Sequence, residues 1–222
     1  MILEVRSLKK SFRGKKVLRD VSFSAGSGSV VGILGENGSG KSTLLSILAG
    51  VLAADGGTCT LDGEDILGVR SAVRRSIGYA PQGTPLLEEL TARDNLLLHY
   101  DRAEMEKELK DGVLATLGID GFLKTTVSKL SGGMKKRLSV GCSVAGRPPV
   151  LLLDEPCAAL DLSCKANILD FIDAHRKGGG IAVLTSHDQT EIAICDKWYI
   201  MKDGVLREYV YDGDIGKLVS EL

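Results

Sequence analysis

The chain has 222 residues, of which 44% are hydrophobic and 26% are charged, and its formal net charge at pH 7 is −1. This is the composition of an ordinary globular protein, and the length suits one large domain. The near-neutral charge gives no basic footprint for DNA or RNA, so we expect no nucleic-acid partner. The sequence contains no run of about 18 apolar residues, so we expect no membrane-spanning helix.

The first residues and the cysteines indicate the cellular compartment in which we expect the protein. Residues 1–5 carry an acidic residue and no basic leader, which predicts a first strand and not a signal peptide. The five cysteines are odd in number and form no C-x-x-C pair. Such usage is typical of free thiols in a reducing compartment, so we expect a cytoplasmic protein.

Apolar runs alternate with helical patterns along the chain. Short β-like runs at 2–5 and 21–23 come before a continuous apolar run at 30–34, which is typical of a strand buried on both faces. A helix is predicted over 43–49, with Gly50 at its C-terminal cap. Further apolar runs occupy 150–153 and 181–184, and a predicted helix at 164–177 lies between them. This alternation predicts an α/β protein with a parallel sheet, whose active residues follow the carboxyl ends of the strands.

Two helices are predicted in the middle of the chain. Capping patterns mark their starts, at Thr91 with Asp94 and at Asp101 with Glu104. The second helix presents one apolar face, formed by Met105, Leu109, Val113, Leu114 and Leu117. Gly118 closes this helix, and we expect its apolar face to pack in a core.

A glycine-rich loop follows the apolar run at 30–34. It consists of Gly35, Glu36, Asn37, Gly38, Ser39, Gly40, Lys41 and Ser42, which match G-x-x-x-x-G-K-[ST] in full, and Thr43 continues it into the helix. Glycines allow successive N–H groups to point at phosphate oxygens, and the helix N-terminus adds the positive end of its dipole. Lys41 is placed to reach the β- and γ-phosphates of ATP, and Ser42 to give Mg²⁺ a hydroxyl ligand.

Two carboxylates follow the apolar run at 150–153. Asp154 takes the place of the Walker B acid, which holds Mg²⁺ in P-loop NTPases. In an extended backbone the side chain of Glu155 points away from that of Asp154. We therefore expect Glu155 to be free to polarise the attacking water.

A further motif lies about twenty residues before these carboxylates. The sequence Leu130-Ser131-Gly132-Gly133-Met134 resembles the L-S-G-G-Q signature of the ABC transporter ATPases. The resemblance implies that Ser131, Gly132 and Gly133 bind the γ-phosphate of an ATP held by a second copy of the domain. A hydroxyl and two glycine N–H groups at a helix start suit that chemistry.

Other elements of the family occur in the same order, and the resemblance implies their roles. Phe12 resembles the aromatic residue that stacks on adenine, and Gln82 the Q-loop glutamine that touches Mg²⁺ and the water. Asp161 resembles the D-loop aspartate, and His187 the switch histidine that senses the γ-phosphate. The expected catalytic residues are Glu155, His187 and Gln82. The expected ligands of Mg²⁺ are Ser42, Gln82 and Asp154.

The chain departs from the family pattern at a few positions. Met134 stands in place of the usual Gln, Cys157 in place of Thr or Ser, and Gly141-Cys142 in place of Ala-Arg. A glycine inside a helix costs roughly 1 kcal/mol relative to alanine. None of these changes removes a phosphate, metal or water ligand, so we expect altered turnover and not a dead enzyme. The basic run at 135–137 predicts a solvated helix face, and a role in attracting the nucleotide is the alternative.

The resemblance also implies the architecture and the partners. We expect a P-loop NTPase core with a mainly parallel sheet, an N-terminal antiparallel β part and an inserted α-helical subdomain. A single ABC ATPase domain would span 1–222, with 1–82 and 147–222 as the nucleotide-binding core and 83–146 as the helical subdomain. Two such domains, identical or different, would sandwich two ATP molecules head to tail. A separate integral membrane permease would hold them at the inner face of the cell membrane.

Segments 77–95 and 130–134 most resemble the ATPases of drug- and lipid-export systems, so export is the expected direction. Two other functions stay open. A soluble ABC protein acting on ribosomes or DNA usually has two such domains or long coiled coils, and this chain has neither. A P-loop kinase for a small molecule needs no signature motif and would need an acceptor-binding insert.

Overall fold

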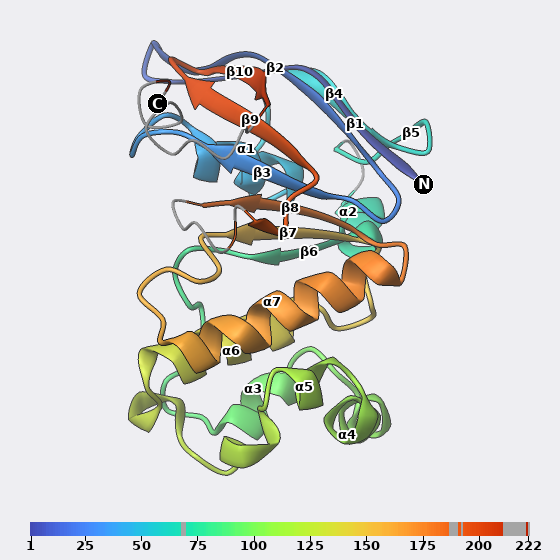
Figure 1. Cartoon of the computed structure of the whole chain (residues 1–222), viewed down its shortest axis with the longest axis vertical. Coiled ribbons are helices and arrows are strands. Elements are labelled where there is room, and N and C mark those ends of the chain that lie inside the picture. The colour runs from blue at the N-terminus through green and yellow to red at the C-terminus, as the bar shows by residue number, and fades with distance from the viewer. Residues whose placement is uncertain (68–69, 187–190, 192, 211–220, 222) are drawn as a thin grey trace.

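The computed structural model describes residues 1–67, 70–186, 191, 193–210 and 221. Its strands form one sheet in the order β5-β4-β1-β2-β10-β9-β3-β8-β7-β6. Figure 1 shows the long N-terminal strands at one end of the molecule and helices α3, α4 and α5 at the other, with α6 and α7 between those helices and the sheet. Within the described ranges, no helix is both long and apolar enough to cross a membrane.

The N-terminal part of the sheet is antiparallel. Strand β1 (Ile2–Phe12) pairs with β2 (Lys15–Gly26) and with β4 (Gly56–Leu61), which pairs with the short β5 (Glu64–Asp65). The apolar runs at 2–5 and 21–23 mark only parts of β1 and β2. Polar residues continue both strands because cross-strand pairing extends to Phe12 and Lys15.

The rest of the sheet is mainly parallel. Strands β6 (Ile77–Ala80), β7 (Val150–Asp154), β8 (Ile181–Thr185) and β3 (Val30–Leu34) run parallel to one another, and β9 (Lys197–Lys202) continues parallel beside β3. Strand β10 (Val205–Tyr209) then pairs antiparallel with β9 and parallel with β2, which joins the two parts. The predicted fold class is confirmed.

Two hydrophobic cores lie on the two faces of this parallel sheet. Successive side chains of a strand point to opposite faces. In β7, Leu151 and Leu153 join the core beneath α6 and α7, whereas Val150 and Leu152 join the core that contains α1 and the N-terminal strands. Burial on both faces explains why these strands are apolar at every position.

The only tryptophan in the sequence packs flat against β3. Trp198 of β9 is buried, and its ring fills the space where a Cβ at Gly32 would lie, 2.1 Å from a ring carbon. Tyr199, the next residue, is also buried and contacts Phe23 from β2, with ring centroids 5.8 Å apart. Both aromatic residues therefore have a packing role.

The helices follow the capping patterns of the sequence. Their bounds are α1 (Lys41–Leu48), α2 (Arg70–Ser76), α3 (Ala92–Leu97), α4 (Arg102–Asp111), α5 (Val113–Thr116), α6 (Gly132–Ser143) and α7 (Leu162–Lys177). The capping box of Thr91 and Asp94 starts α3, and Asp101 caps α4. The described elements between 83 and 146 are α3 to α6 and two 3₁₀ turns. The limits of a separate subdomain there stay a prediction, and we call 83–146 the helical segment.

The helix expected from 102 to 117 is broken. Gly112 has an extended backbone, with φ −117° and ψ −156°, and separates α4 from α5. A Cβ at Gly112 would lie 2.1 Å from a carboxylate oxygen of Glu108, whose Oε2 accepts a hydrogen bond from the backbone N of Val113 at 2.9 Å. Periodicity alone does not show this buried carboxylate, which replaces the helical partner of that N–H group.

Packing also explains Gly141 inside α6. A Cβ there would lie 2.7 Å from Ile119 Cδ1 and 2.9 Å from Leu114 Cδ2, and both side chains are fully buried. The Tyr100 hydroxyl donates a hydrogen bond to the Gly141 carbonyl at 2.8 Å. The glycine lets the helical segment approach α6 closely, which offsets its poor helix propensity.

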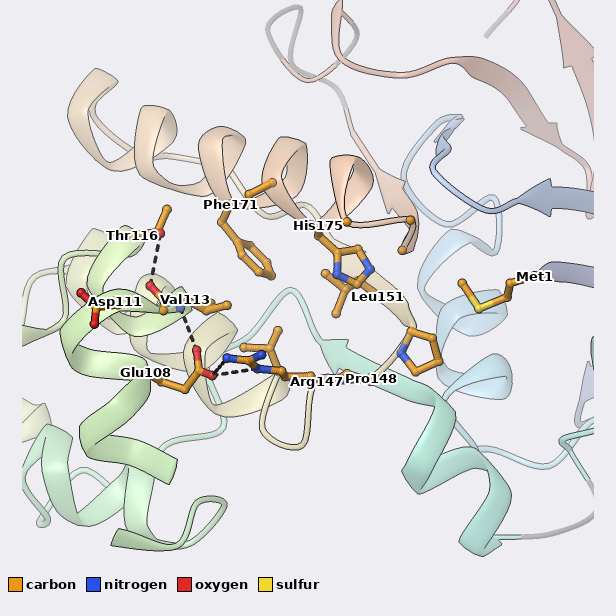
Figure 2. Close-up of a pocket in the computed structure, with 17 residues that line it drawn as sticks. Met1, Glu108, Asp111, Val113, Thr116, Arg147, Pro148, Leu151, Phe171 and His175 are labelled. Carbon is orange, nitrogen blue, oxygen red and sulfur yellow. Dashed lines mark hydrogen bonds and ion pairs between the residues drawn. The ribbon is translucent and has the colours of Figure 1, made fainter. Parts of the chain in front are cut away.

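A cavity of about 580 Å³ lies where the helical segment meets the start of β7 and the end of α7. Figure 2 shows Glu108 and Arg147 paired on one side of it, and Phe171 and His175 from α7 on another. Glu108 is 2% exposed, and its Oε1 accepts from Arg147 Nε at 2.8 Å. This ion pair ties α4 to the loop that leads into β7.

We expect Glu108→Ala to lower the free energy of unfolding by about 2 kcal/mol. The variant removes a charged hydrogen bond and leaves the Val113 N–H group without its acceptor. Urea unfolding measures the change. Lys107→Ala, an exposed neighbour in α4, is the control and should stay within about 0.5 kcal/mol. An unchanged urea midpoint for Glu108→Ala would contradict the structural role of the pair.

Candidate functional site

The glycine-rich loop joins β3 to α1 and has a strained, inward-curled backbone. Gly35, Gly38 and Gly40 have positive φ angles of 153°, 83° and 113°. A Cβ at Gly35 would lie 2.4 Å from the Met201 carbonyl oxygen, so no larger residue fits there. Among the described residues, no side chain caps the start of α1, and the Ser39 hydroxyl is buried without a hydrogen-bond partner. The loop therefore offers free donors of the kind that bind an anion.

Lys41 lies at the first position of α1 and is 6% exposed. Its Nζ donates to the carbonyl oxygens of Gly35 at 2.6 Å and Glu36 at 3.1 Å. Burial lowers the pKa of the ammonium, and the charges of Glu155 and Asp154 act against that shift. A desolvated cation folded back over the loop is suited to exchange these carbonyls for phosphate oxygens.

One hydroxyl group links the Asp154 carboxylate to the backbone N–H group of Glu155 at the end of β7. Thr185, at the end of β8, is fully buried and lies directly opposite Asp154 in the sheet register. Its Oγ1 donates to Asp154 Oδ1 at 2.6 Å and accepts from the backbone N of Glu155 at 3.0 Å. Sequence analysis missed Thr185. The signal that could have indicated it is a polar residue at the end of an apolar strand, the same position that Asp154 occupies in β7.

The backbone at Glu155 is not extended, so that expectation was wrong. β7 ends at Asp154, and Glu155 has a left-handed φ of 47°. The hydrogen bond from its N–H group to Thr185 favours this turn. The side chain of Glu155 then meets Gln82, whose Nε2 donates to Glu155 Oε2 at 2.9 Å. Gln82 follows β6, the strand beside β7, so both residues lie at one edge of the sheet.

Lys41, Gln82 and Glu155 line one cavity of about 530 Å³, and the buried Asp154 and Thr185 are not among its lining residues. It is lined by Phe12, Val17, Asn37, Gly38, Gly40, Lys41, Ser42, Thr43, Gln82 and Glu155. Phe12 is 44% exposed and lies beside the loop, with the Lys10 ammonium 5.4 Å from its ring centroid. The structure thus brings the predicted adenine, phosphate and water residues together. His187 lies outside the described residues.

The signature motif lies elsewhere. Ser131 caps α6, accepting a hydrogen bond from Met134 N at 3.2 Å, and is exposed. Asp161 caps α7 in the same way, accepting from Cys164 N at 2.8 Å, and this bond lowers the pKa of its carboxyl. A Cβ at Gly133 would lie 2.6 Å from Cys164 Sγ, so the starts of α6 and α7 pack together. None of these residues lines the described part of the cavity with Lys41.

The basic run after the signature is not a solvated face, contrary to expectation. Lys136 is 5% exposed, and its ammonium donates to backbone carbonyls of the core. Lys135 pairs with Glu88, and Arg137 donates to the Leu117 carbonyl. Three consecutive residues of a helix point in different directions, which is why the run has no common surface.

Comparison with known proteins identifies the family. The sequence profile of the ABC transporter family matches residues 18–158. The chain belongs to the ABC transporter family. This makes it an ABC-type ATP hydrolase, in agreement with the phosphate loop and the carboxylates described above.

Individual relatives and structures agree with this assignment. The chain is 32% identical to the lipopolysaccharide export system ATP-binding protein LptB of Escherichia coli, over 92% of this chain and 88% of LptB. It is 31% identical to the linearmycin resistance ATP-binding protein LnrL of Bacillus subtilis, over 91% of this chain and 67% of LnrL. A solved ATP-binding subunit of an ABC transporter matches with a TM-score of 0.87 and 27% identity, over 100% of this chain and 99% of that one. The cassette MJ0796, described as dimeric in a post-hydrolysis state bound to ADP and Pi, matches with a TM-score of 0.83 and 25% identity, over 96% and 100% of the two chains.

We expect Thr185→Val to lower the free energy of unfolding by about 2 kcal/mol. The change keeps the shape of the side chain but removes the partner of the buried Asp154 carboxylate and of the Glu155 N–H group. Thr185→Ser keeps the hydroxyl and should recover most of the loss. Chemical denaturation of the wild type and the two variants measures these differences in the free energy of unfolding. Equal stability of the valine and serine variants would show that the hydroxyl link contributes nothing.

Proposed function

We propose that this chain is the ATP-hydrolysing subunit of an ABC transporter, and that it works as one half of a head-to-tail dimer. Each dimer would hold two ATP molecules between the phosphate loop of one domain and the Ser131-Gly132-Gly133 segment of the other. Closing and reopening of the dimer would drive transport, in the export direction, through a separate membrane permease.

One observation supports this reading above the others. The cavity that contains Phe12, Lys41 and Glu155 is open and lacks the signature residues, which lie at the exposed start of α6. A single copy therefore has only part of the donor set that the fully charged γ-phosphate needs. A second domain that presents its own Ser131 across this opening would complete the site.

The residues of the cavity divide the binding task. Phe12 stacks on the adenine, and the loop from Gly35 to Thr43 binds the phosphates through its N–H groups, Ser39 and Lys41. Lys41 gives up its bonds to the Gly35 and Glu36 carbonyls when it reaches the β- and γ-phosphates. The unpartnered Ser39 hydroxyl and the uncapped start of α1 fit a bound phosphate.

The donor set near the carboxylates fits Mg²⁺. Ser42, Gln82 and Asp154 offer a hydroxyl, an amide oxygen and a carboxylate, the oxygen ligands that this ion prefers. The hydrogen bond from Thr185 uses one oxygen of Asp154 and leaves the other available. When bound, Mg²⁺ would neutralise charge on the β- and γ-phosphates.

Glu155 and Gln82 act on the water. The amide nitrogen of Gln82 donates to Glu155, which orients the carboxylate and leaves the amide oxygen of Gln82 free. Glu155 accepts a proton from the water. At the same time the oxygen of the water bonds to the γ-phosphorus, and the bond from that phosphorus to the ADP oxygen breaks. His187 and the partner's Ser131 segment sense and bind the γ-phosphate in the closed dimer.

Transport and location are inferred from the relatives. LptB belongs to a lipopolysaccharide export system, and LnrL confers linearmycin resistance, so both names fit an exporter. We infer that the chain lies in the cytoplasm, peripheral to the inner face of the membrane and attached through its permease. Gln82 and the helical segment that follows it would pass the motion of the dimer to that partner.

Lys41→Ala should weaken ATP binding by about a hundredfold, because it removes the buried charge that pairs with the phosphates. Isothermal calorimetry with Mg²⁺·ATP measures the dissociation constant. Lys110→Ala, at an exposed position of α4, is the control and should bind as the wild type does. Unchanged affinity of Lys41→Ala would refute the assignment of the loop.

Glu155→Gln should bind Mg²⁺·ATP, form a dimer and hydrolyse ATP at least about a hundredfold more slowly than the wild type. The amide keeps the shape of the side chain but accepts no proton. Size-exclusion chromatography with Mg²⁺·ATP and a phosphate-release assay measure the two effects. Brisk hydrolysis by Glu155→Gln would show that the catalytic carboxylate lies elsewhere.

A second variant tests the dimer. Ser131→Arg in the Glu155→Gln background places a long side chain at the exposed start of α6 and should block closure sterically. The double variant should run as a monomer and still bind ATP through its own loop. A dimer of unchanged stability would contradict the head-to-tail arrangement.

A further inference from the structure

Lys136 is a buried cation at the junction of three segments that carry site residues. It lies in the second turn of α6 and is 5% exposed. Its Nζ donates to the backbone oxygens of Pro81 at 2.9 Å, Asp154 at 3.2 Å and Gln82 at 3.3 Å. An ammonium group has three N–H donors, so these three acceptors use all of them.

The three carbonyls lie at the ends of two neighbouring strands. β6 and β7 are parallel, and their last paired residues are Ala80 and Leu153. A buried backbone carbonyl beyond the last paired residues of two strands has no donor on the neighbouring strand and needs one from elsewhere. Lys136 supplies that donor from a helix, so the α6 backbone is held against the turn of Gln82 and the turn of Asp154.

Its neighbours on α6 make contacts of a different kind. Lys135 pairs with Glu88 outside the parallel sheet, at 2.7 Å. Arg137 donates to the Leu117 carbonyl at 2.8 Å and lies over the Phe122 ring, so it contacts the helical segment itself. Of this basic run, Lys136 is the residue whose described hydrogen bonds reach the strand ends.

We propose that Lys136 is a positioning residue, which sets Gln82 and Glu155 for hydrolysis and joins them to the signature helix. The inference rests on the proposed function, because it assigns a role within the same ATPase site. Lys136 does not touch the nucleotide cavity as described. It acts through the backbone oxygens of Gln82 and Asp154. The side chain of Gln82 is hydrogen-bonded to that of Glu155, the residue after Asp154.

The link has a consequence for the dimer. Ser131, which starts α6, would serve the ATP held by the other domain, whereas Gln82 and Glu155 serve the ATP held by their own. Only the first four residues of α6 separate Ser131, its N-cap, from Lys136. The ammonium thus connects the two ATP sites mechanically, since α6 cannot shift without moving or breaking its three bonds to the strand ends.

The test separates the rate of hydrolysis from nucleotide affinity. Lys136→Met keeps the length of the side chain and removes all three donors. Its kcat for ATP hydrolysis should fall about ten- to a hundredfold, because small errors in the position of reacting groups cost that much. Its dissociation constant for Mg²⁺·ATP, measured by calorimetry, should stay within about threefold. Lys135→Met is the matched control and should keep the wild-type kcat.

Further variants make the result specific to the ammonium. Lys136→Arg keeps a charge and several donors and should recover most of the lost kcat. In a Gln82→Ala background, Lys136→Met should cause a smaller loss than in the wild type, because both changes affect the same group. If Lys136→Met does not fold, Lys136→Gln, with two donors, takes its place with the same expected pattern.

The outcomes distinguish this inference from the proposed function. Wild-type kcat in Lys136→Met, a parallel loss of affinity and kcat, equal rates for the methionine and arginine variants, or full additivity with Gln82→Ala would each overturn the positioning role. All four can occur while Glu155→Gln remains inactive, which leaves the proposed function intact. Failure of the proposed function would instead appear as equal hydrolysis by the wild type and Glu155→Gln.

Discussion

The buried end of β7 is the fixed point on which the rest of the site depends. Asp154 is 2% exposed, and its side chain accepts a hydrogen bond from Thr185 while its backbone oxygen accepts one from Lys136. A buried carboxylate and a buried backbone carbonyl are each costly unless they are hydrogen-bonded, so the first requires β8 and the second requires α6 at this place. Once β7 is placed, β6 on one side of it places Gln82, and β8 on the other side pairs with β3, which leads into the phosphate loop.

Local chemistry explains what the sequence predicted well. The phosphate loop depends on glycine dihedrals and on a helix start, and both are properties of consecutive residues. The capping box at Thr91 and the cap at Asp101 are local in the same way. The continuous apolar strands followed from burial on both faces. For these reasons the fold class could be anticipated. The grouping of Phe12 and Gln82 with Lys41 and Glu155 around one cavity was implied by the resemblance to the ABC family.

The errors share a cause, which is a polar side chain that bonds backbone groups outside the regular pattern of its own helix or strand. Periodicity predicted one helix through Gly112, but the buried Glu108 carboxylate ends it there. Charge alone predicted that Lys136 is solvated, but three carbonyls from other segments surround its ammonium. An extended Glu155 was expected, but the Thr185 hydroxyl holds its N–H group in a turn. A side chain that satisfies backbone groups of another element leaves no periodic signal in the sequence.

The packing of Trp198 against Gly32 gives the protein a built-in optical probe. The chain has one tryptophan, so its ultraviolet emission comes mainly from a single indole of β9, which is buried against Gly32 of β3, the strand that leads into Gly35. Burial in an apolar site shifts indole emission to shorter wavelengths, and exposure on unfolding shifts it back. Changes in the strand beneath the phosphate loop can therefore be followed in the native chain without adding a label.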